Sequence, residues 1–488
     1  MRKKYFINVS IFISFILLLL FVSNCAKNDA TGERQLVILS EEEESDIGAR
    51  EHPNIVKSFS GIYQNEKLQN YIKKIGTKIV LNSEIANIRW TFTILDTPIV
   101  NAFALPGGYV YVTRGLLSLA NDEAEIASVL AHEIAHVTAK HSAQRHAKAT
   151  LSEIGLNILS VVVGQPLVTN IANIGVQGVL SAFSRSEELE ADQLSIGYII
   201  KSKYDPNGSV RFLKRLDALT NILSKTEQNS INSLFSTHPK TMDRIIKSKN
   251  SIPKNIEYKS FKKEYLAAIN NMTYGDNSSH GIVKGNKFFH TELNFSFTVP
   301  NNYKIINNDN SVISFNEDKS SIVIFDGLYN DENLTLLEIA ESNYVRSNID
   351  SHKELFIDKN LAIVFKEKNP VVFEGEKYLR STYLINWTNN RIWRFSLLVN
   401  PLKKKKYVEE LNNIATSIHY LSEEEKIDGR PNYIQIVETK SGDTPNKLSK
   451  AMVIRENKLE IFSIINGLDK VNSNETLSEG ILVKIIVN

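Results

Sequence analysis

The chain has 488 residues, of which 42% are hydrophobic and 23% are charged, a composition that is typical of globular proteins and excludes a disordered chain. The 57 basic and 55 acidic residues leave a net charge of +2, so the basic excess typical of nucleic-acid-binding proteins is absent and no nucleic-acid partner is expected. The single cysteine, Cys25, excludes a disulfide framework and a cysteine-based zinc finger. At about 100–200 residues per domain, the length predicts two to four domains.

Residues 1–24 have the pattern of an export signal. Residues 2–4 are Arg-Lys-Lys, and residues 6–23 are uncharged and rich in Ile, Phe and Leu. Because the only cysteine follows directly, the segment resembles a bacterial lipoprotein signal, which implies cleavage and lipidation of Cys25. The alternatives are a plain signal peptide and an uncleaved membrane anchor, and all three place the bulk of the protein outside the cytoplasm. Lys27, with no Asp at the second position, favours the outer membrane by the usual sorting pattern of such lipoproteins.

The next part of the chain predicts helices with a few strands. Residues 25–44 are expected to form a polar tether, and residues 45–85 have apolar side chains near helical spacing. Strands are expected at 90–95 and 110–113 because both are rich in β-branched and aromatic residues. Helical patterns return at 122–146 and 186–222.

Residues 154–184 contain no charged residue, which raises the question of membrane contact. Glycines and Pro166 interrupt the segment, so we expect two buried or interfacial helices with a break near Pro166. A hairpin that touches the membrane is the alternative.

The second half predicts a different architecture. Residues 256–285 are polar and linker-like, and residues 286–420 consist of short strands between Asn, Asp and Gly turns, with helices expected at 334–350 and 405–418. We interpret 286–420 as a separate β-rich domain of unknown role. A charged linker is expected at 421–432 and a small module at 433–488.

The segment from His132 to His136 reads His-Glu-Ile-Ala-His and matches the H-E-x-x-H pattern inside the predicted helix 122–146. Two histidines four residues apart on a helix lie about 40° apart around its axis and can converge on one ion. Glu133 lies one step around the helix, where its carboxylate reaches a metal-bound water without ligating the metal. Zinc lowers the pKa of such a water, and a carboxylate takes its proton as the water attacks an amide carbonyl.

The alternative for this motif is a surface helix with solvated His and Glu side chains. The surrounding residues predict instead that the helix is largely buried, where two histidines and a glutamate require partners. A metal site is therefore favoured. The apolar neighbours are Ile126, Val129, Leu130, Ile134 and Val137.

A third protein ligand is expected from residues 184–192. Glu188 and Asp192 are four residues apart, so they share one helical face. One can ligate the zinc, and the other can accept the N–H of a ligand histidine and fix its tautomer. Glu187 and Glu190 lack this spacing to Asp192 and are interpreted as solvated charges.

Three segments in order resemble one family: NAFALPGGYVYVTRGLL (101–117), EIASVLAHEIAHVTAKH (125–141) and SRSEELEAD (184–192). They resemble the CaaX-prenyl-endopeptidase-type zinc metallopeptidases, nearest the bacterial periplasmic, BepA-like branch. The resemblance covers roughly residues 30–250 and includes TGERQLV (31–37). It implies a mainly helical zincin-type domain with a small sheet over 45–255. It also implies one zinc ion held by His132, His136 and Glu188, with Glu133 as the general base and Asp192 orienting a ligand histidine.

The strand that begins with Gly107, Gly108, Tyr109 and Val110 is expected to lie beside the zinc as an edge strand. An extended substrate would add to such an edge by main-chain pairing, which requires an unfolded segment more than a particular sequence. The alternative is a simple core strand.

His238 stands in a Ser-Thr-His-Pro segment (236–239). By spacing alone, a histidine before proline is a structural loop residue. The family carries a matching segment, and the resemblance implies that His238 approaches the zinc, where it either plugs the fourth position in a latent state or steadies the oxyanion. His141 and His146 extend the predicted active helix and are expected to turn away from the zinc, as supporting or surface groups.

Residues 433–488 resemble a LysM-type module, a small βααβ domain that binds peptidoglycan glycans in many proteins. The best matches are SGDT (441–444) and INGL (465–468). The alternative is a folding or docking cap.

The sequence thus predicts a multidomain α+β protein: a zinc-dependent endopeptidase, lipid-anchored in the cell envelope and facing the periplasm, that degrades unfolded or misassembled envelope proteins. One alternative is a chaperone-like or scaffolding envelope protein in which His238 blocks the zinc. Another is an envelope anchor that binds peptidoglycan through 433–488.

Overall fold

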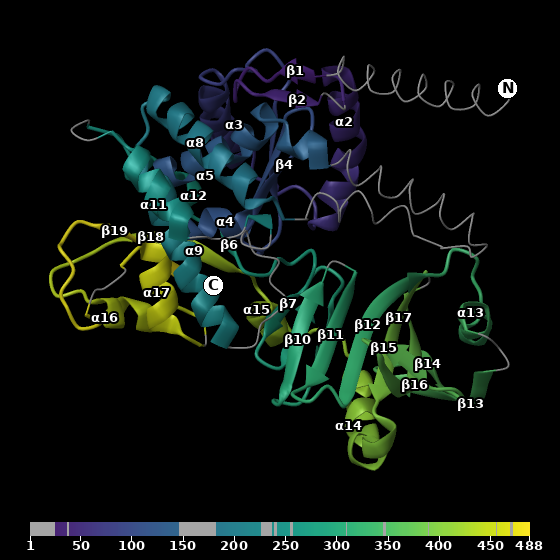
Figure 1. Cartoon of the computed structure of the whole chain (residues 1–488). Coiled ribbons are helices and arrows are strands. Elements are labelled where there is room, and N and C mark those ends of the chain that lie inside the picture. The colour runs from purple at the N-terminus through teal and green to yellow at the C-terminus, as the bar shows by residue number, and fades with distance from the viewer. Residues whose placement is uncertain are drawn as a thin grey trace, which may run out of the picture. The chain divides into compact units, whose positions relative to one another are not determined.

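The computed structural model describes residues 25–36, 39–145, 182–225, 237–238, 242–253, 257–308, 310–344, 348–388, 390–454, 456–468 and 472–488. The chain divides into two compact units (Figure 1): Met1–Tyr274 together with Tyr433–Val487, and Gly275–Asn432 together with Asn488. The predicted export signal, and residues 154–181 of the uncharged segment, lie outside the described residues.

A three-stranded sheet forms part of the core of the first unit. Its order is β3 (Thr91–Leu95), β5 (Tyr109–Thr113) and β4 (Ala102–Leu105), with β5 parallel to β3 and antiparallel to β4. The prediction of an edge strand at Tyr109 and Val110 is therefore wrong, because β4, which the sequence analysis did not single out, takes the outer position and pairs with β5. Gly107 and Gly108 have φ of +78° and +84°, as a tight turn between β4 and β5 requires.

The predicted tether is in part a helix. α2 (Glu41–Ser58) begins with a capping box in which Ser40 and Glu43 satisfy each other's backbone N–H groups. The acidic run 41–44 is therefore the first turn of a helix, where negative charge is favourable. Before it, β1 (Cys25–Lys27) pairs with β2 (Arg34–Leu36). The next helices are α3 (Glu66–Val80) and α4 (Arg114–Leu119).

The central helix of the first unit is α5 (Glu123–Thr138), which Asp122 caps and which is buried along nearly its whole length. It contacts α8 (Arg185–Lys201) and α9 (Asn207–Lys225), as Figure 1 shows. α11 (Met242–Ser251) contacts both α8 and α9. Because α5 is buried along nearly its whole length, any polar group that it carries must find a partner inside the protein.

The C-terminal segment belongs to the first unit. β18 (Asn432–Glu438) lies between β19 (Leu482–Val487) and β6 (Thr273–Tyr274), and Ile434 and Ile464 share a core cluster with side chains of α5. The buried Nζ of Lys484 donates to the backbone oxygens of Ser118 (2.9 Å) and Ala120 (2.7 Å) at the end of α4. The segment has the element order β18, α16 (Pro445–Lys450), α17 (Lys458–Asn466), β19.

Residues 256–285, predicted as a linker, contain helix α12 (Lys262–Ile269) and strand β6. Tyr265, Leu266 and Ile269 of α12 are buried in the core of the first unit. Because the segment is polar overall, the sequence did not predict that α12 has one apolar face.

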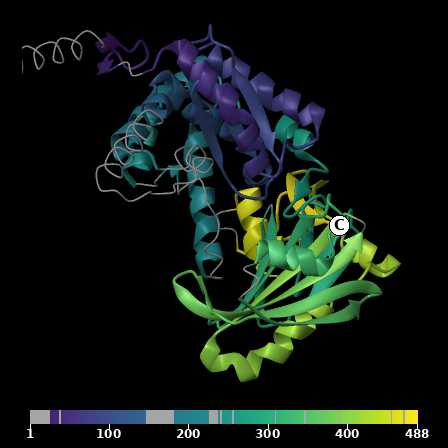
Figure 2. The same cartoon turned by 90° about the vertical axis from the view of Figure 1, so that its right-hand side faces the viewer.

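The second unit is β-rich. An antiparallel sheet has the order β10-β11-β12-β17-β16-β14-β13, with β15 paired to β16, and a smaller sheet has the order β7-β8-β9. Helix α14 (Lys404–Thr416) lies across one face of the larger sheet (Figure 2), where Tyr407, Leu411 and Ile414 pack among its aromatic side chains. The strands are β7 (Ile282–Lys284), β8 (Lys287–His290), β9 (Phe295–Thr298), β10 (Tyr303–Asn308), β11 (Ser311–Asn316), β12 (Ser321–Tyr329), β13 (Ile349–Ile357), β14 (Asn360–Glu367), β15 (Val371–Phe373), β16 (Glu376–Thr388) and β17 (Arg391–Val399).

Two predictions for the second unit need correction. The helix expected at 334–350 is shorter, because α13 (Leu336–Asn343) ends well before β13 begins at Ile349. The linker expected at 421–432 contains α15 (Glu423–Asp428), whose N-terminus has a capping box formed by Ser422 and Glu425.

The prediction of an α+β protein with a helical first part and a β-rich second part is confirmed. No described helix has the length and apolar character needed to cross a bilayer.

Candidate metal centre

Two histidines of α5 face the same point. Nε2 of His132 and Nε2 of His136 lie 3.1 Å apart, as expected for side chains one helical turn apart. His136 is fully buried, and the ring of Phe183 stacks on it with the ring centroids 3.8 Å apart. Both nitrogens are thus held toward the interface between α5 and α8.

Glu188 on α8 completes this group of donors. Its Oε1 lies 3.5 Å from Nε2 of His136, and its Oε2 lies 3.5 Å from Nε2 of His132. One donor atom from each of His132, His136, Glu188 and His238 lies within 4.8 Å of the others, so these four buried residues could hold a metal ion. Imidazole nitrogens and a carboxylate oxygen in this number fit zinc.

Glu133 supports the presence of a further group at this site. Its side chain is 1% exposed, and neither carboxylate oxygen accepts a hydrogen bond from the described residues. A buried carboxylate without hydrogen bonds is costly. A metal with a bound water beside it would satisfy these oxygens.

The electrostatics of the group favour a cation. Burial by itself would raise the pKa of Glu188, but His238, His132 and His136 hold it below the ordinary value, so Glu188 remains a carboxylate. Burial would lower the pKa of His132, but its contacts with Asp192 and Glu188 raise it to about 10. Burial lowers the pKa of His136 well below its usual value.

Asp192 contacts the ring of His132. Its Oδ1 lies 3.1 Å from Nδ1 of His132, on the side of the ring opposite Nε2. Arg244 of α11 donates from Nε and Nη2 to the two oxygens of Asp192 at 2.7 and 2.8 Å, and its third nitrogen pairs with Glu188. The structure therefore brings Glu188 to the donor group and Asp192 to the far side of a histidine.

His141 contacts the other histidine and Glu190 contacts His141, and this pairing of Glu190 corrects its interpretation as a solvated charge. Nδ1 of His141 lies 3.0 Å from Nδ1 of His136, and Nε2 of His141 lies 2.9 Å from Oε2 of Glu190. Of the two alternatives expected for His141, the supporting group is the one that the structure favours, because α5 ends at Thr138 and a φ of +62° at Lys140 turns the chain back, so that His141 contacts the nitrogen of His136 opposite Nε2. His146 lies outside the described residues.

His238 is buried in the same group. Its Nδ1 lies 2.8 Å from Oε1 of Glu188 and 3.3 Å from Nε2 of His132, and its Nε2 lies 3.4 Å from Oε1 of Glu133. His238, which lies 106 residues after His132 in the chain, thus contacts both the donors and Glu133.

The strand residues predicted to bind substrate lie elsewhere in the core. Val110 is 1% exposed and belongs to the main core cluster of the first unit. Tyr109 packs against His52 with ring centroids 5.5 Å apart. Position 107 lies against α2, since a Cβ there would come within 2.6 Å of the Cα of Ser45.

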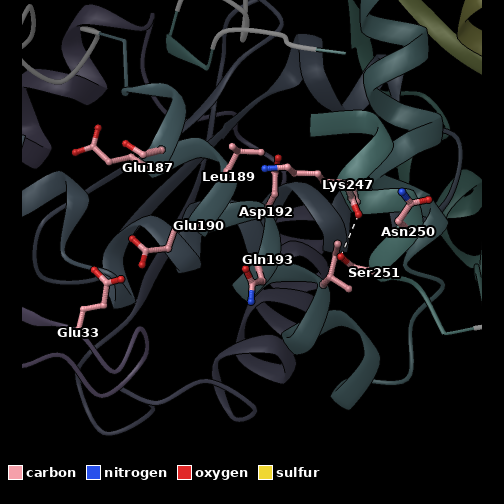
Figure 3. A pocket seen from close by; sticks show the side chains of 12 residues that line it. Glu33, Glu187, Leu189, Glu190, Asp192, Gln193, Lys247, Asn250 and Ser251 are labelled. Carbon is pink, nitrogen blue, oxygen red and sulfur yellow. Dashed lines mark hydrogen bonds between the residues drawn. The ribbon is translucent and has the colours of Figure 1, made fainter. Parts of the chain in front are cut away.

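A polar pocket of about 630 Å³ lies on the outer side of α8. Figure 3 shows Glu187 and Glu190 on one side of it and Lys247, Asn250 and Ser251 on the other. Glu190 therefore joins this pocket to the metal centre through His141.

A family model described as Peptidase family M48 matches residues 66–251, which include all the residues of the donor group. This region is a peptidase family M48 domain. The resemblance found from three sequence motifs is thereby confirmed. Zinc is the metal of M48 peptidases, and the donor group of the M48 domain fits it.

Several curated proteins are similar to this chain. The mitochondrial metalloendopeptidase OMA1 of Schizosaccharomyces pombe is 32% identical over 185 residues, which are 38% of this chain and 52% of that protein. A putative beta-barrel assembly-enhancing protease of Vibrio cholerae is 32% identical over 191 residues, 37% of this chain and 38% of that protein. The beta-barrel assembly-enhancing protease of Escherichia coli K12 is 30% identical over 193 residues, 38% of each chain. The chain thus spans about half or less of the length of these relatives.

Proposed function

We propose that this protein is a zinc-dependent metalloendopeptidase of the bacterial cell envelope that hydrolyses peptide bonds of unfolded or misassembled envelope proteins. The observation that carries the activity is the buried Glu133, free of hydrogen bonds to the described residues, beside a group of zinc donors in an M48 domain. The names of the bacterial relatives, beta-barrel assembly-enhancing proteases, support envelope proteins as the substrate class.

Each residue of the site has one role in this proposal. His132, His136 and Glu188 hold the zinc, and Asp192 accepts the Nδ1–H of His132 so that Nε2 faces the metal. Zinc, when bound, supplies a water of lowered pKa and polarises the scissile carbonyl. Glu133 takes up the proton of the attacking water and then passes it to the leaving amine nitrogen.

Zinc content and casein cleavage, measured on the purified full chain, test the proposal. We expect about one zinc per chain in the wild type, retained zinc without cleavage in Glu133→Gln, and loss of zinc in Glu188→Ala. Glu187→Gln is the matched control, because Glu187 lies next to Glu188 but caps the start of α8 in solvent. A wild-type chain that is folded and binds no zinc would overturn the proposal.

A latent zinc site is the second candidate, and the position of His238 favours it. His238 is 3% exposed and lies within contact distance of two donors and of Glu133, where a fourth ligand would exclude water. His238→Ala is then expected to raise casein cleavage. If the protein acts mainly as a chaperone-like scaffold, Glu133→Gln would instead leave its cellular function intact.

We also propose that Cys25 is lipidated and anchors the protein in the outer membrane, with the M48 domain in the periplasm. The basic and apolar residues before Cys25 support this placement. Labelling with a radioactive fatty acid, compared between wild type and Cys25→Ser, tests it. Label that persists in Cys25→Ser would contradict it.

Residues 433–488 are proposed as a LysM-like module that binds peptidoglycan. The order β18-α16-α17-β19 supports the resemblance. Since β18 and Lys484 pack into the first unit, the test uses the full chain and not a deletion. Co-sedimentation of the chain with purified sacculi would support binding if soluble chitooligosaccharides reverse it. Absence of the chain from the pellet would favour the docking-cap alternative.

A further inference from the structure

A small cavity of about 40 Å³ lies next to the metal centre, between α5, α8 and α9. Glu133, His132 and His238 line the part that faces the metal donors. Val129, Phe212 and Leu213 line it as well and supply its apolar surface. The cavity is therefore continuous with the groups that would carry out hydrolysis.

Away from the metal donors and Glu133, the polar residues around this cavity already have hydrogen-bond partners. The hydroxyls of Ser128, Ser195 and Ser209 donate to the carbonyl oxygens of Ala124, Asp192 and Pro206, three or four residues earlier in the chain, at 2.8, 2.8 and 3.1 Å. The guanidinium of Arg244 is held by Asp192 and Glu188. A charged or strongly polar group entering the part of the cavity between Val129, Phe212 and Leu213 would therefore lose its water without gaining a partner, whereas an apolar group would lose nothing.

The size of the cavity limits what it accepts. A water molecule needs roughly 10–15 Å³ of such space, so the cavity holds the volume of about three waters. That volume suits the methyl group of Ala or the isopropyl group of Val. The side chains of Phe and Trp are too large to enter without displacing Phe212 or α9, which the close packing of protein interiors resists.

The position of Glu133 decides which substrate residue enters. In amide hydrolysis the general base that takes the proton of water returns it to the leaving nitrogen, so this nitrogen must lie within reach of Glu133. The residue that carries the leaving nitrogen then has its side chain beside Glu133, where the cavity lies.

We propose that this cavity binds the side chain of the substrate residue on the C-terminal side of the scissile bond, and that it selects Ala and Val over large aromatic residues. The proposal rests on the proposed peptidase function and adds a preference at one substrate position. The protein would then cut unfolded chains mainly before small apolar residues.

The test maps cleavage sites in a mixture of unstructured synthetic peptides by mass spectrometry, with the full zinc-loaded chain. We expect Ala and Val after the cut at least about tenfold more often than Phe or Trp, the range that a hydrophobic pocket provides for a size difference. Leu213→Ala enlarges the cavity and should admit Leu and Phe, whereas Ser209→Leu fills it and should shift the preference toward Gly and Ala. Leu219→Ala is the matched control, because Leu219 is also a partly buried leucine of α9 but does not line the cavity.

The outcomes separate this proposal from the proposed function. Cleavage with no preference at this position, or the same profile in Leu213→Ala as in wild type, would overturn the cavity assignment and leave the peptidase intact. Absence of any cleavage in both the wild type and His238→Ala would overturn the peptidase. In that case the affinity of zinc-loaded Glu133→Gln for peptides that begin with Ala or with Phe still tests the cavity, and equal affinities would exclude it.

Discussion

Nδ1 of His141 lies 3.0 Å from Nδ1 of His136, and the opposite nitrogen of His141 lies 2.9 Å from Oε2 of Glu190. If Nε2 of His136 binds the metal, its Nδ1 carries the proton and donates it to His141, which in turn donates from Nε2 to Glu190. In this arrangement the ring N–H groups of His136 and His141 each have an acceptor, and Glu190 has a donor. His141 and Glu190 are therefore positioning residues for a ligand histidine.

Substitution of His141 by Ala is expected to lower zinc affinity by about 10- to 100-fold, since groups behind a metal ligand typically contribute this much. Glu190→Gln keeps a hydrogen-bond acceptor and should have a smaller effect. Competition with a chromogenic chelator measures the affinity. Glu187→Gln, at a half-exposed position of the same helix, is the control, and unchanged affinity in His141→Ala would refute the role.

Asp192 contributes to the other ligand histidine and to the fold. Asp192→Ala removes the contact with the ring of His132 and takes one carboxylate partner, but not Glu188, from Arg244, which is 4% exposed. We expect a loss of zinc affinity of about 10- to 100-fold and a lower melting temperature, because a buried charge loses a partner. Asp428→Ala, on an exposed position of α15, should change neither, and the same values in both variants would contradict the prediction.

Lys484 fastens the C-terminal segment to the M48 domain. It is fully buried, burial holds its pKa well below the ordinary value, and its Nζ donates to backbone oxygens at the end of α4. Lys484→Met keeps the apolar stem but removes the donor from these helix-end carbonyls. The free energy of unfolding of the first unit should fall by about 2–4 kcal/mol. Calorimetry compares this variant with Lys450→Met, which lies on the surface of the same segment.

His290 is expected to make the second unit sensitive to acid. Burial lowers its pKa from 6.5 to about 4, and its Nδ1 accepts the backbone N–H of Leu293, which requires the neutral ring. The unfolded chain binds a proton below pH 6.5 and the folded chain only near pH 4, so stability present above pH 6.5 is lost as the pH falls toward 4. The loss amounts to roughly 3 kcal/mol over this window.

Urea unfolding at pH 7 and pH 5 tests this dependence. In a Trp90→Phe background, fluorescence reports on Trp387 and Trp393, which both lie in the core of the second unit. His290→Asn should lose less stability between the two pH values than the wild type. His352→Asn, at an exposed position of β13, should behave like the wild type, and a parallel fall in all three proteins would exclude His290 as the cause.

Local patterns were sufficient to predict several elements and the chemistry that they carry. On any helix, 3.6 residues per turn place positions four apart on the same face, so the spacing of His132 and His136 predicts that both rings face one point, with Glu133 beside them. The same rule pairs Glu188 with Asp192. The strands β3 and β5 and the alternation of short strands in the second unit follow from β-branched and aromatic residues in short runs.

The tertiary structure decided which of these elements meet. Whether β5 is an edge or a central strand depends on the pairing of residues 102–105, and pairing across a sheet depends on packing that no single strand encodes. His141 reaches His136 because the helix stops at Thr138, and His238 contacts Glu188 although 50 residues separate them in the chain. The sequence by itself determined the ligand types and their helical faces, since these follow from local geometry. The surroundings of the ligands, the cavity beside Glu133 and the docking of Lys484 arise from contacts between segments far apart in the chain, so only the folded protein reveals them.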